Sequence, residues 1–454
     1  MNVVMVLFNY FLCRMNNLLF KHRHFLYSVL LILPTYFGFS VEYYLLLIAS
    51  VFILEYKALF NLWNLFISAP FSRKNRVVWV VLFLMIFSLA NKLYHGIELI
   101  GLKDYYASFY LFPFLIIISK VAFDKKMLKF FVFITLFEVL FAIAEYFVGV
   151  KTFFMDIGEL NTITNYNLLY DSTVFGLSVN SSILALKILV AFILIDFVKF
   201  PKITNWVVRI LLLAALLISF SRVVILVVLI YWAIVFLVKV LQTKGGALKK
   251  SNFQFYGVVL LLLLIFPNSF KNQFTRGAHQ AESIYVAETT VEPEFKKVEI
   301  RTGNPTITSV TIGPNEEKPL NIGFGDKLFG YAENIQSSGR KLIWTNYLNY
   351  IEKNFLFGNG SDKLMFGLWV EKTESYKLVH AHNSYLMLLA TNGVLISFLY
   401  AIIYLLLFKS KNFFALGAIF LYSLANYGVF WGFSYLDFIF LALLMHNFKP
   451  NYDN

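Results

Sequence analysis

The residues best equipped for chemistry form the polar stretch His380–Ala381–His382–Asn383–Ser384, where a long polar segment gives way to an apolar run. Polar groups beside a membrane-spanning segment tend to be functional. A histidine, with an ordinary pKa of about 6.5, can accept the proton of an attacking hydroxyl at neutral pH. The stretch therefore predicts a general base for a hydroxyl nucleophile.

Two plainer interpretations of the same stretch stay open. Asn383 or Ser384 can serve as an ordinary N-cap of the helix that follows. His380 and His382 alternate as a metal-binding pair does, but no acidic residue or cysteine has a suitable spacing to complete the ligand set.

Two arginines are the other candidates. Arg222 ends Ser219–Phe220–Ser221–Arg222, a connection between two apolar runs that is short enough to keep the residue near membrane depth. Arg340 begins an amphipathic segment that also contains Trp344. A guanidinium group binds phosphate or diphosphate through two parallel hydrogen bonds. The alternatives are an arginine that snorkels to the lipid headgroups and a solvated charge at a helix start.

Composition determines what surrounds these residues. Apolar residues make up 59% of the 454 residues and charged residues 14%, against roughly 45–50% and 25% in soluble domains. Several apolar runs approach the roughly 20 residues that cross a bilayer. The chain is therefore predicted to be an all-α polytopic membrane protein. Its single cysteine, Cys13, excludes an intramolecular disulfide.

About twelve transmembrane helices are expected. The predicted spans are 25–40, 43–58, 77–94, 107–121, 129–149, 181–198, 206–219, 223–239, 254–270, 394–408, 412–427 and 432–447. With this count, the clusters of lysine and arginine all fall on one side. The positive-inside rule makes that side cytoplasmic and puts both termini there. The net charge of +13 is thus explained by topology, and no nucleic-acid partner is needed.

The domain organisation follows from the longest polar segment. We expect a transmembrane bundle over 1–270, an external loop domain over 271–383 between spans nine and ten, and a second part of the bundle over 384–454. The first part of the loop, including 309–312, predicts short strands or irregular structure. Residues 340–355 predict an amphipathic helix that buries Ile343, Tyr347, Tyr350 and Ile351. The glycines of 358–360 should end it.

These motifs together resemble the O-antigen polymerase and O-antigen ligase superfamily of bacterial membrane glycosyltransferases. The resemblance rests on Arg340–Lys341–Leu342–Ile343–Trp344, Gly358–Asn359–Gly360, Ala381–His382–Asn383–Ser384–Tyr385–Leu386 and Leu388–Leu389–Ala390–Thr391–Asn392–Gly393–Val394, in that order. Ser219–Phe220–Ser221–Arg222 is similar to the family's outer-face Ser-Arg element. Gly176 followed by Asn180 is a weaker match to its Gly/Asn element.

The resemblance implies transfer of a saccharide from undecaprenyl diphosphate to an acceptor sugar, on the periplasmic face of the bacterial inner membrane. No metal or cofactor is expected. In this interpretation His382 is the general base, and Arg222 and Arg340 neutralise the leaving diphosphate. Asn383 or His380 orients the imidazole, and Asn180 and Trp344 complete the substrate-binding set. The implied partners are the lipid-linked oligosaccharide, membrane lipid and a chain-length regulator.

Several functions remain to be separated. A polymerase adds the saccharide to another lipid-linked repeat unit, whereas a ligase adds it to lipid A–core. The loop 271–383 has as many acidic as basic residues, which favours the polymerase, because a ligase must bind a heavily anionic acceptor. A twelve-span secondary transporter is the main alternative of another class, and a non-catalytic membrane scaffold is a further one. Sparse intramembrane charge, clearest at Glu138 and Glu145, argues against the transporter.

Overall fold

The fold is that of a computed structural model of the whole chain. It describes residues 22–37, 43–55, 73–95, 109–120, 125–148, 174, 176–178, 181–198, 200–219, 221–242, 297–301, 308–311, 340–358, 360, 364–370, 373–379, 381–407, 410, 412–426, 428–429 and 435–446.

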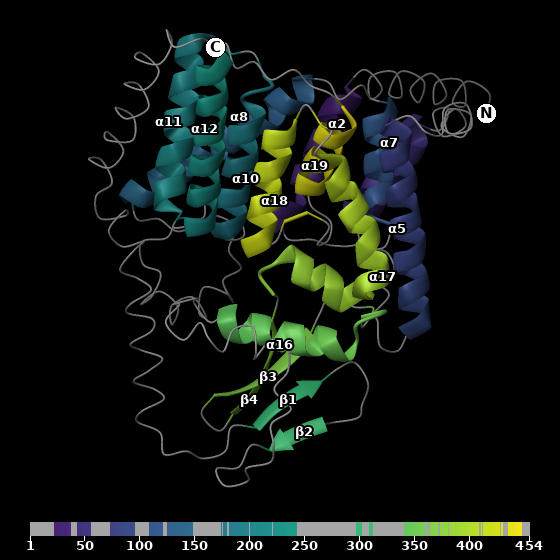
Figure 1. Cartoon of the computed structure of the whole chain (residues 1–454). Helices are drawn as coiled ribbons and strands as arrows, with labels where there is room; N and C mark the ends of the chain where they lie inside the picture. The colour runs from purple at the N-terminus through teal and green to yellow at the C-terminus, as the bar shows by residue number, and fades with distance from the viewer. Residues whose placement is uncertain are drawn as a thin grey trace, which may run out of the picture.

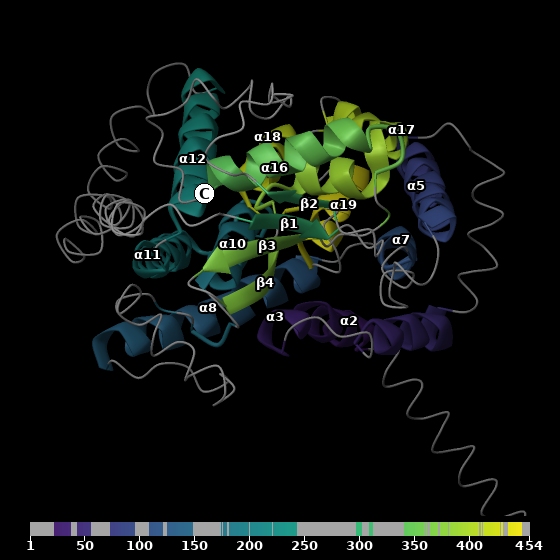
Figure 2. The same ribbon diagram turned by 90° about the horizontal axis from the view of Figure 1, so that it is seen from below.

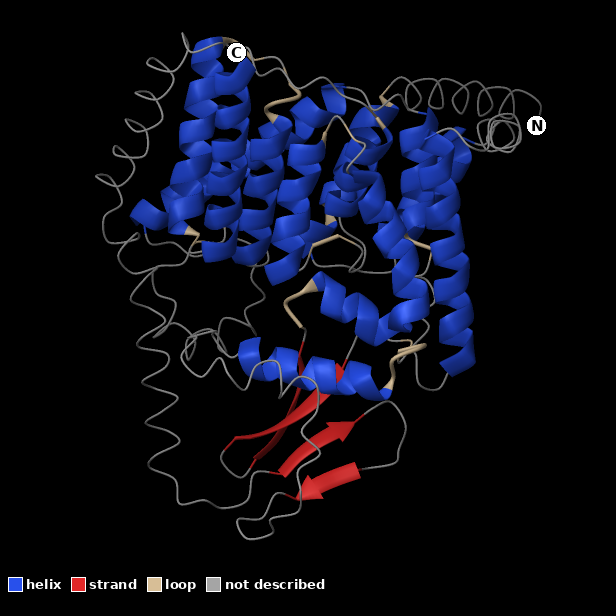
Figure 3. Ribbon diagram, in the orientation of Figure 1, coloured by secondary structure: helices blue, strands red, loops and turns tan. Residues whose placement is uncertain are grey.

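Most of these residues belong to a helical bundle (Figures 1 and 3). Its helices are α2 (Arg23–Ile32), α3 (Pro34–Phe37), the helix Tyr43–Glu55, α5 (Arg73–His95), α7 (Leu111–Lys120), α8 (Lys125–Val148), α10 (Ser181–Leu194), α11 (Lys202–Ile218), α12 (Arg222–Gln242), α17 (Ser384–Leu407), α18 (Phe413–Ala425) and α19 (Tyr435–Met445).

Three of the described helices are long and apolar enough to cross a membrane, namely Asn75–His95, Lys126–Tyr146 and Ser384–Leu406. Six shorter apolar helices accompany them. Large apolar side chains point away from the bundle, among them Ile86 at 59% exposure, Leu226 at 59% and Phe398 at 64%. A surface of this kind indicates contact with lipid. These features indicate a mostly helical integral membrane protein.

The described helices overlap eleven of the twelve predicted spans. The remaining one, 254–270, lies outside the described residues. The count of twelve and the orientation of the termini therefore stay predictions.

Buried apolar side chains hold the bundle together. Edge-to-face contacts such as that between Phe114 of α7 and Phe438 of α19, with ring centroids 5.7 Å apart, join neighbouring helices. Every residue of α19 is buried, so this helix lies at the centre of the bundle. A helix that is apolar on all sides is stable only when it is covered in this way.

The external part consists of α16 (Arg340–Lys353) and a small sheet, which lie beside one end of the bundle (Figures 1 and 2). The strands β1 (Lys297–Arg301), β2 (Thr308–Thr311), β3 (Leu364–Val370) and β4 (Thr373–Val379) pair antiparallel in the order β2-β1-β3-β4. The predicted strand near 309–312 is therefore confirmed as β2. The prediction of an all-α protein is right for the bundle and incomplete for the loop, because β3 and β4 were not foreseen.

Candidate functional site

The candidate groups lie at the starts of helices. Arg222 is the first residue of α12 and Arg340 the first residue of α16, while His382 and Asn383 directly precede α17. A helix start presents unpaired N–H groups and the positive end of the helix dipole, which favour an anion. The side chain of Arg340 lies outside the described residues, as do His380 and Asn180.

The backbone at His382 is unusual. Its φ of 48° makes it the only described residue other than glycine with a positive φ. The next residue, Asn383, begins the helix: its Oδ1 accepts hydrogen bonds from the N–H groups of Tyr385 at 2.9 Å and Leu386 at 3.1 Å. The N-cap interpretation of Asn383 is thereby confirmed, so its Oδ1 already serves the helix. Because Oδ1 is used in this cap, it is not the atom by which Asn383 would orient the imidazole.

Trp344 connects α16 to this turn. Its indole Nε1–H donates a hydrogen bond of 2.6 Å to the carbonyl of Ala381, the residue before His382. The buried side chains of Tyr347, Tyr350 and Ile351 pack with Ala381, Met387 and Ala390 in one cluster. The predicted apolar stripe of α16 is confirmed at these three positions, while the side chain of Ile343 lies outside the described residues. Trp344 thus supports the backbone of His382.

Ser384 attaches the start of α17 to the bundle. Its hydroxyl accepts a hydrogen bond of 2.7 Å from the N–H of Gly428 and donates one of 3.3 Å to the carbonyl of Asn426. Both partners follow α18, which packs along α12. The helix that starts at Arg222 and the turn that holds His382 therefore share a neighbour.

A break at Gly393 divides α17 into two parts. Gly393 has φ 66° and ψ −179°, a conformation available essentially to glycine alone. At this break Gly358 and Gly393 meet: a Cβ on Gly358 would lie 2.5 Å from the carbonyl oxygen of Ala390, and one on Gly393 would lie 2.2 Å from that of Leu356. The part of α17 before Gly393 therefore runs beside α16. The part after Gly393 turns into the bundle beside α5 (Figure 1).

Hydrogen bonds complete this interlock. The N–H of Gly360 donates to the carbonyl of Thr391 at 2.8 Å, and that of Val394 donates to Phe355 at 2.8 Å. From α5, Asn91 Nδ2 donates to the carbonyl of Phe357 at 2.8 Å and to that of Thr391 at 3.2 Å. The loop helix was predicted to extend to residue 355 and to end at these glycines, but it already ends at Lys353, and a turn leads from there to Gly358. The glycines instead seat α17.

Arg222 has a different environment. The side chain is exposed, and only three residues separate it from Ile218, the last residue of α11. The buried Ser219 donates a hydrogen bond of 2.8 Å to the carbonyl of Leu216, which closes the last turn of α11. The predicted short connection is confirmed. Arg222 stands at its end with its guanidinium group accessible.

Residues 207–401 match the family model described as O-antigen ligase. The match covers less than half of the chain and supports a relation to the O-antigen ligase and polymerase superfamily. The matched residues contain Arg222, Arg340, Trp344 and His382 together with both glycines of the interlock. No curated protein and no solved structure matches the chain.

The family match has direct consequences for the alternatives. Members of the O-antigen ligase and polymerase superfamily are membrane glycosyltransferase-like enzymes that act on lipid-linked oligosaccharides, and the match gives no support to a transporter. It does not separate polymerase from ligase. Within the described ranges, no group of three or more His, Cys, Asp and Glu side chains could hold a metal ion.

Some residues near the candidate site were not singled out from the sequence. Asn91 and Ser88 of α5 contact the break in α17, Ser88 by a hydrogen bond of 3.4 Å from its hydroxyl to Asn392 Oδ1. Their signal was weak, because a serine and an asparagine near the end of an apolar run usually mark the membrane interface. Lys187 gave a stronger signal, because a lysine in the middle of an apolar run indicates a functional or paired charge.

Proposed function

We propose that this protein transfers a saccharide from a polyprenyl diphosphate to an acceptor sugar on the outer face of the membrane, as the resemblance to the O-antigen ligase and polymerase superfamily implies. The observation that carries the proposal is the Trp344–Ala381 hydrogen bond. It connects the helix that begins at Arg340 to the turn that contains His382, so a cation and a base belong to one small assembly.

In the proposed reaction, the acceptor hydroxyl attacks the anomeric carbon of the donor sugar. The bond from that carbon to the diphosphate oxygen breaks, and its electron pair leaves with the diphosphate. Arg222 and Arg340 stabilise the negative charge that develops there, aided by the N–H groups of the helix starts. His382 accepts the proton of the attacking hydroxyl. Atoms and charge balance without a metal or cofactor.

The remaining predicted residues have supporting roles in this proposal. Trp344 holds the turn and borders the acceptor site, and Asn383 caps α17 beside it. His380 and Asn180 remain proposals from the resemblance alone. Activity that persists when divalent metals are chelated would agree with this scheme, whereas strict metal dependence would favour His380 and His382 as ligands.

We infer a polymerase as the specific activity, because the loop 271–383 has no excess of basic residues for an anionic acceptor. A ligase is the second candidate, favoured by the match to the O-antigen ligase family. Deletion of the gene separates them. A polymerase mutant should carry lipopolysaccharide capped with a single repeat unit, whereas a ligase mutant should carry none on its core.

The proposed orientation is that of an inner-membrane protein with cytoplasmic termini. Reporter fusions within 150–180 and 271–383 should be active outside, and fusions within 243–253 or at either terminus should be active inside. A cytoplasmic 271–383 loop would contradict the mechanism, because donor and site would then lie on opposite sides.

A further inference from the structure

The strongest feature outside this site is a charge pair inside the bundle. Glu138 of α8 and Lys187 of α10 are both fully buried, and Lys187 Nζ lies 2.6 Å from Glu138 Oε2. Tyr36 donates a hydrogen bond of 3.3 Å to the same oxygen, and its ring centroid lies 3.8 Å from Lys187 Nζ. Ionised groups at membrane depth are costly and are usually retained for function. A function is therefore expected for this ion pair.

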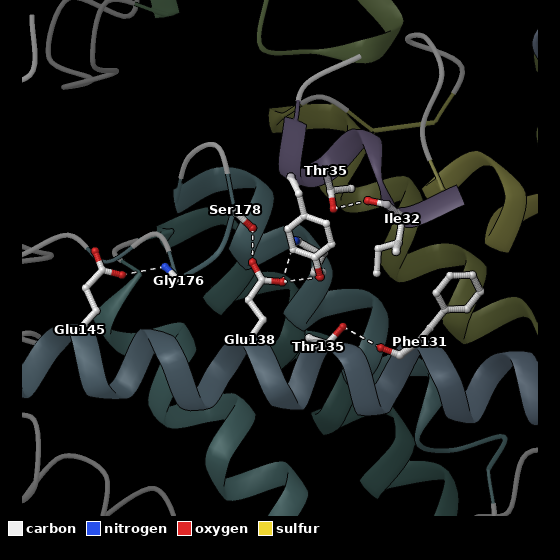
Figure 4. A network of polar contacts seen from close by, with 10 residues as sticks. Ile32, Thr35, Phe131, Thr135, Glu138, Glu145, Gly176 and Ser178 are labelled. Carbon is white, nitrogen blue, oxygen red and sulfur yellow. Dashed lines mark hydrogen bonds and ion pairs between the residues drawn. The ribbon is translucent and has the colours of Figure 1, made fainter. Parts of the chain in front are cut away.

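The residues 176–178, which precede α10, contact this face of α8. The Ser178 hydroxyl donates to Glu138 Oε1, and the Gly176 N–H donates to Glu145 Oε2 at 2.8 Å (Figure 4). Glu138 and Glu145 are separated by two helical turns and thus lie on the same face of α8. The two carboxylates hold this segment at two points.

Gly176 shows how close this contact is. Its φ is +59°, and a Cβ there would lie 3.2 Å from both Cγ and the carbonyl oxygen of Glu138. Only glycine accepts that conformation without strain. The segment therefore packs closely against α8 at Glu138.

The same segment reaches the connection that carries Arg222. The N–H of Val174 donates a long hydrogen bond of 3.5 Å to the carbonyl of Ile218, the last residue of α11. Val174 and Ser219 are both buried there. Contacts of the described residues 174 and 176–178 thus connect Lys187 and Glu138 on one side with the end of α11, just before Arg222, on the other.

We propose that Glu138 and Lys187 are positioning residues for Arg222. The ion pair with Lys187 holds the Glu138 carboxylate in one orientation, so that it binds Ser178 in one place, and the residues Val174 and 176–178 transmit that place to the start of α12. The proposal rests on the proposed role of Arg222 at the diphosphate. Buried ion pairs can provide such specificity even where they add little stability.

The chain contains a matched control. Arg23 Nε lies 3.4 Å from Glu55 Oε1, to which Tyr27 donates a hydrogen bond of 3.3 Å. Cation, carboxylate and tyrosine therefore repeat the combination of Lys187, Glu138 and Tyr36. This second group joins α2 to the helix Tyr43–Glu55.

The test compares three variants in the full-length protein in lipid nanodiscs: Glu138→Leu/Lys187→Met, Ser178→Ala, and Glu55→Leu/Arg23→Met as the control. Removing both charges of a pair avoids leaving one charge buried alone. Ser178→Ala keeps the pair and removes only its bond to the segment, so it remains informative if the first variant is poorly folded.

The first readout is a distance that does not depend on activity. With Cys13→Ser as background, spin labels at Leu177→Cys and at the lipid-exposed Leu226→Cys report the separation of the segment from α12. We expect one narrow distribution in the parent and the control, and a broadened or shifted one in the other two variants. An unchanged distribution in both would overturn the proposal.

The second readout is coupling to Arg222. We expect the Glu138→Leu/Lys187→Met variant to lose roughly ten- to a hundredfold in activity, as for a misplaced catalytic group, but to lose little more when Arg222→Lys is already present. Additive losses would overturn the link to Arg222. The proposed function fails separately, if Arg222→Ala retains full activity while the distance still changes.

Discussion

The two turns that carry His382 and Arg222 are built in opposite ways. Around His382, the indole of Trp344, the cap of Asn383 and the hydroxyl of Ser384 all hold the backbone, and the Gly358–Gly393 interlock fixes the helix that follows. Arg222 follows a three-residue connection and has an exposed side chain.

This difference corresponds to the two proposed tasks. Proton transfer needs the base within hydrogen-bond reach of the acceptor hydroxyl, about 2.6–3.2 Å between heavy atoms, so the base benefits from a rigid support. Attraction between a guanidinium group and a diphosphate falls off slowly with distance. An exposed arginine can therefore meet a lipid-linked anion as it arrives, provided that its helix start is in place.

The largest effect should follow from removal of the base. His382→Ala should reduce turnover by roughly 10²–10⁴-fold, since a general base contributes that much, with normal protein in the membrane. The measurement is polymer formation from lipid-linked repeat units by purified protein. His446→Ala is the control, because that imidazole lies 3.0 Å from the carbonyl of Ile118 in the bundle. Equal activity of both variants would remove His382 from the mechanism.

The exposed arginine should be next in magnitude. Arg222→Ala should cost roughly 10²–10³-fold, comparable to loss of one donor to a developing oxyanion. Arg222→Lys should restore part of the loss, because the charge returns without the bidentate fork. Arg76→Ala provides the comparison, as another exposed arginine in the first turn of an apolar helix. Full rescue by lysine would show that charge alone suffices.

The interlock should be sensitive mainly in stability. Gly393→Ala places a Cβ 2.2 Å from the Leu356 carbonyl oxygen, and the backbone strain alone should cost about 1–3 kcal/mol. In α18, the Cβ of Gly417→Ala would meet no atom within 4 Å, so this control should be neutral or gain up to about 1 kcal/mol. Thermal unfolding in detergent compares the two. Equal midpoints would mean that α16 and α17 are not locked together.

The smallest effect should come from the support behind the base. Trp344→Phe keeps a ring in place but removes the hydrogen bond to Ala381, which should cost about 1 kcal/mol of stability and at most roughly tenfold in turnover. Trp232→Phe, on α12 at an edge-to-face contact with Phe192, should leave turnover unchanged. A turnover loss from Trp232→Phe as large as that from Trp344→Phe would indicate a general effect on the bundle.

Local signals predicted much of the fold and part of the site. Apolar runs located the helices, the pattern of 340–355 located α16 and its buried face, and Asn383 was one of two predicted caps. Each of these follows from residues that are close in sequence. The strand β3 was missed because Leu364–Val370 is continuously apolar and lacks the alternation of a half-buried strand.

Contacts between distant residues could not be predicted in this way. The Trp344 indole and the Ala381 carbonyl belong to different elements, and nothing in either local pattern specifies the bond. The same holds for Asn91 at the break in α17, and for Lys187 and its partner Glu138. A lone lysine in an apolar run indicates that an opposite charge lies nearby. Only the packing of the helices determines which carboxylate that is.

The cluster formed by α16 and the start of α17 also bears on how such proteins can be recombined. Tyr347, Tyr350 and Ile351 lie before residue 383, and their partners Met387 and Ala390 lie after it. A chimera that exchanges the loop with a joint at 383/384 would place foreign side chains against this cluster and replace one half of the glycine pair. A joint beyond Leu395 would transplant the cluster and both glycines together. The bonds from α5 and those between Ser384 and the residues after α18 would then form the new boundary to match.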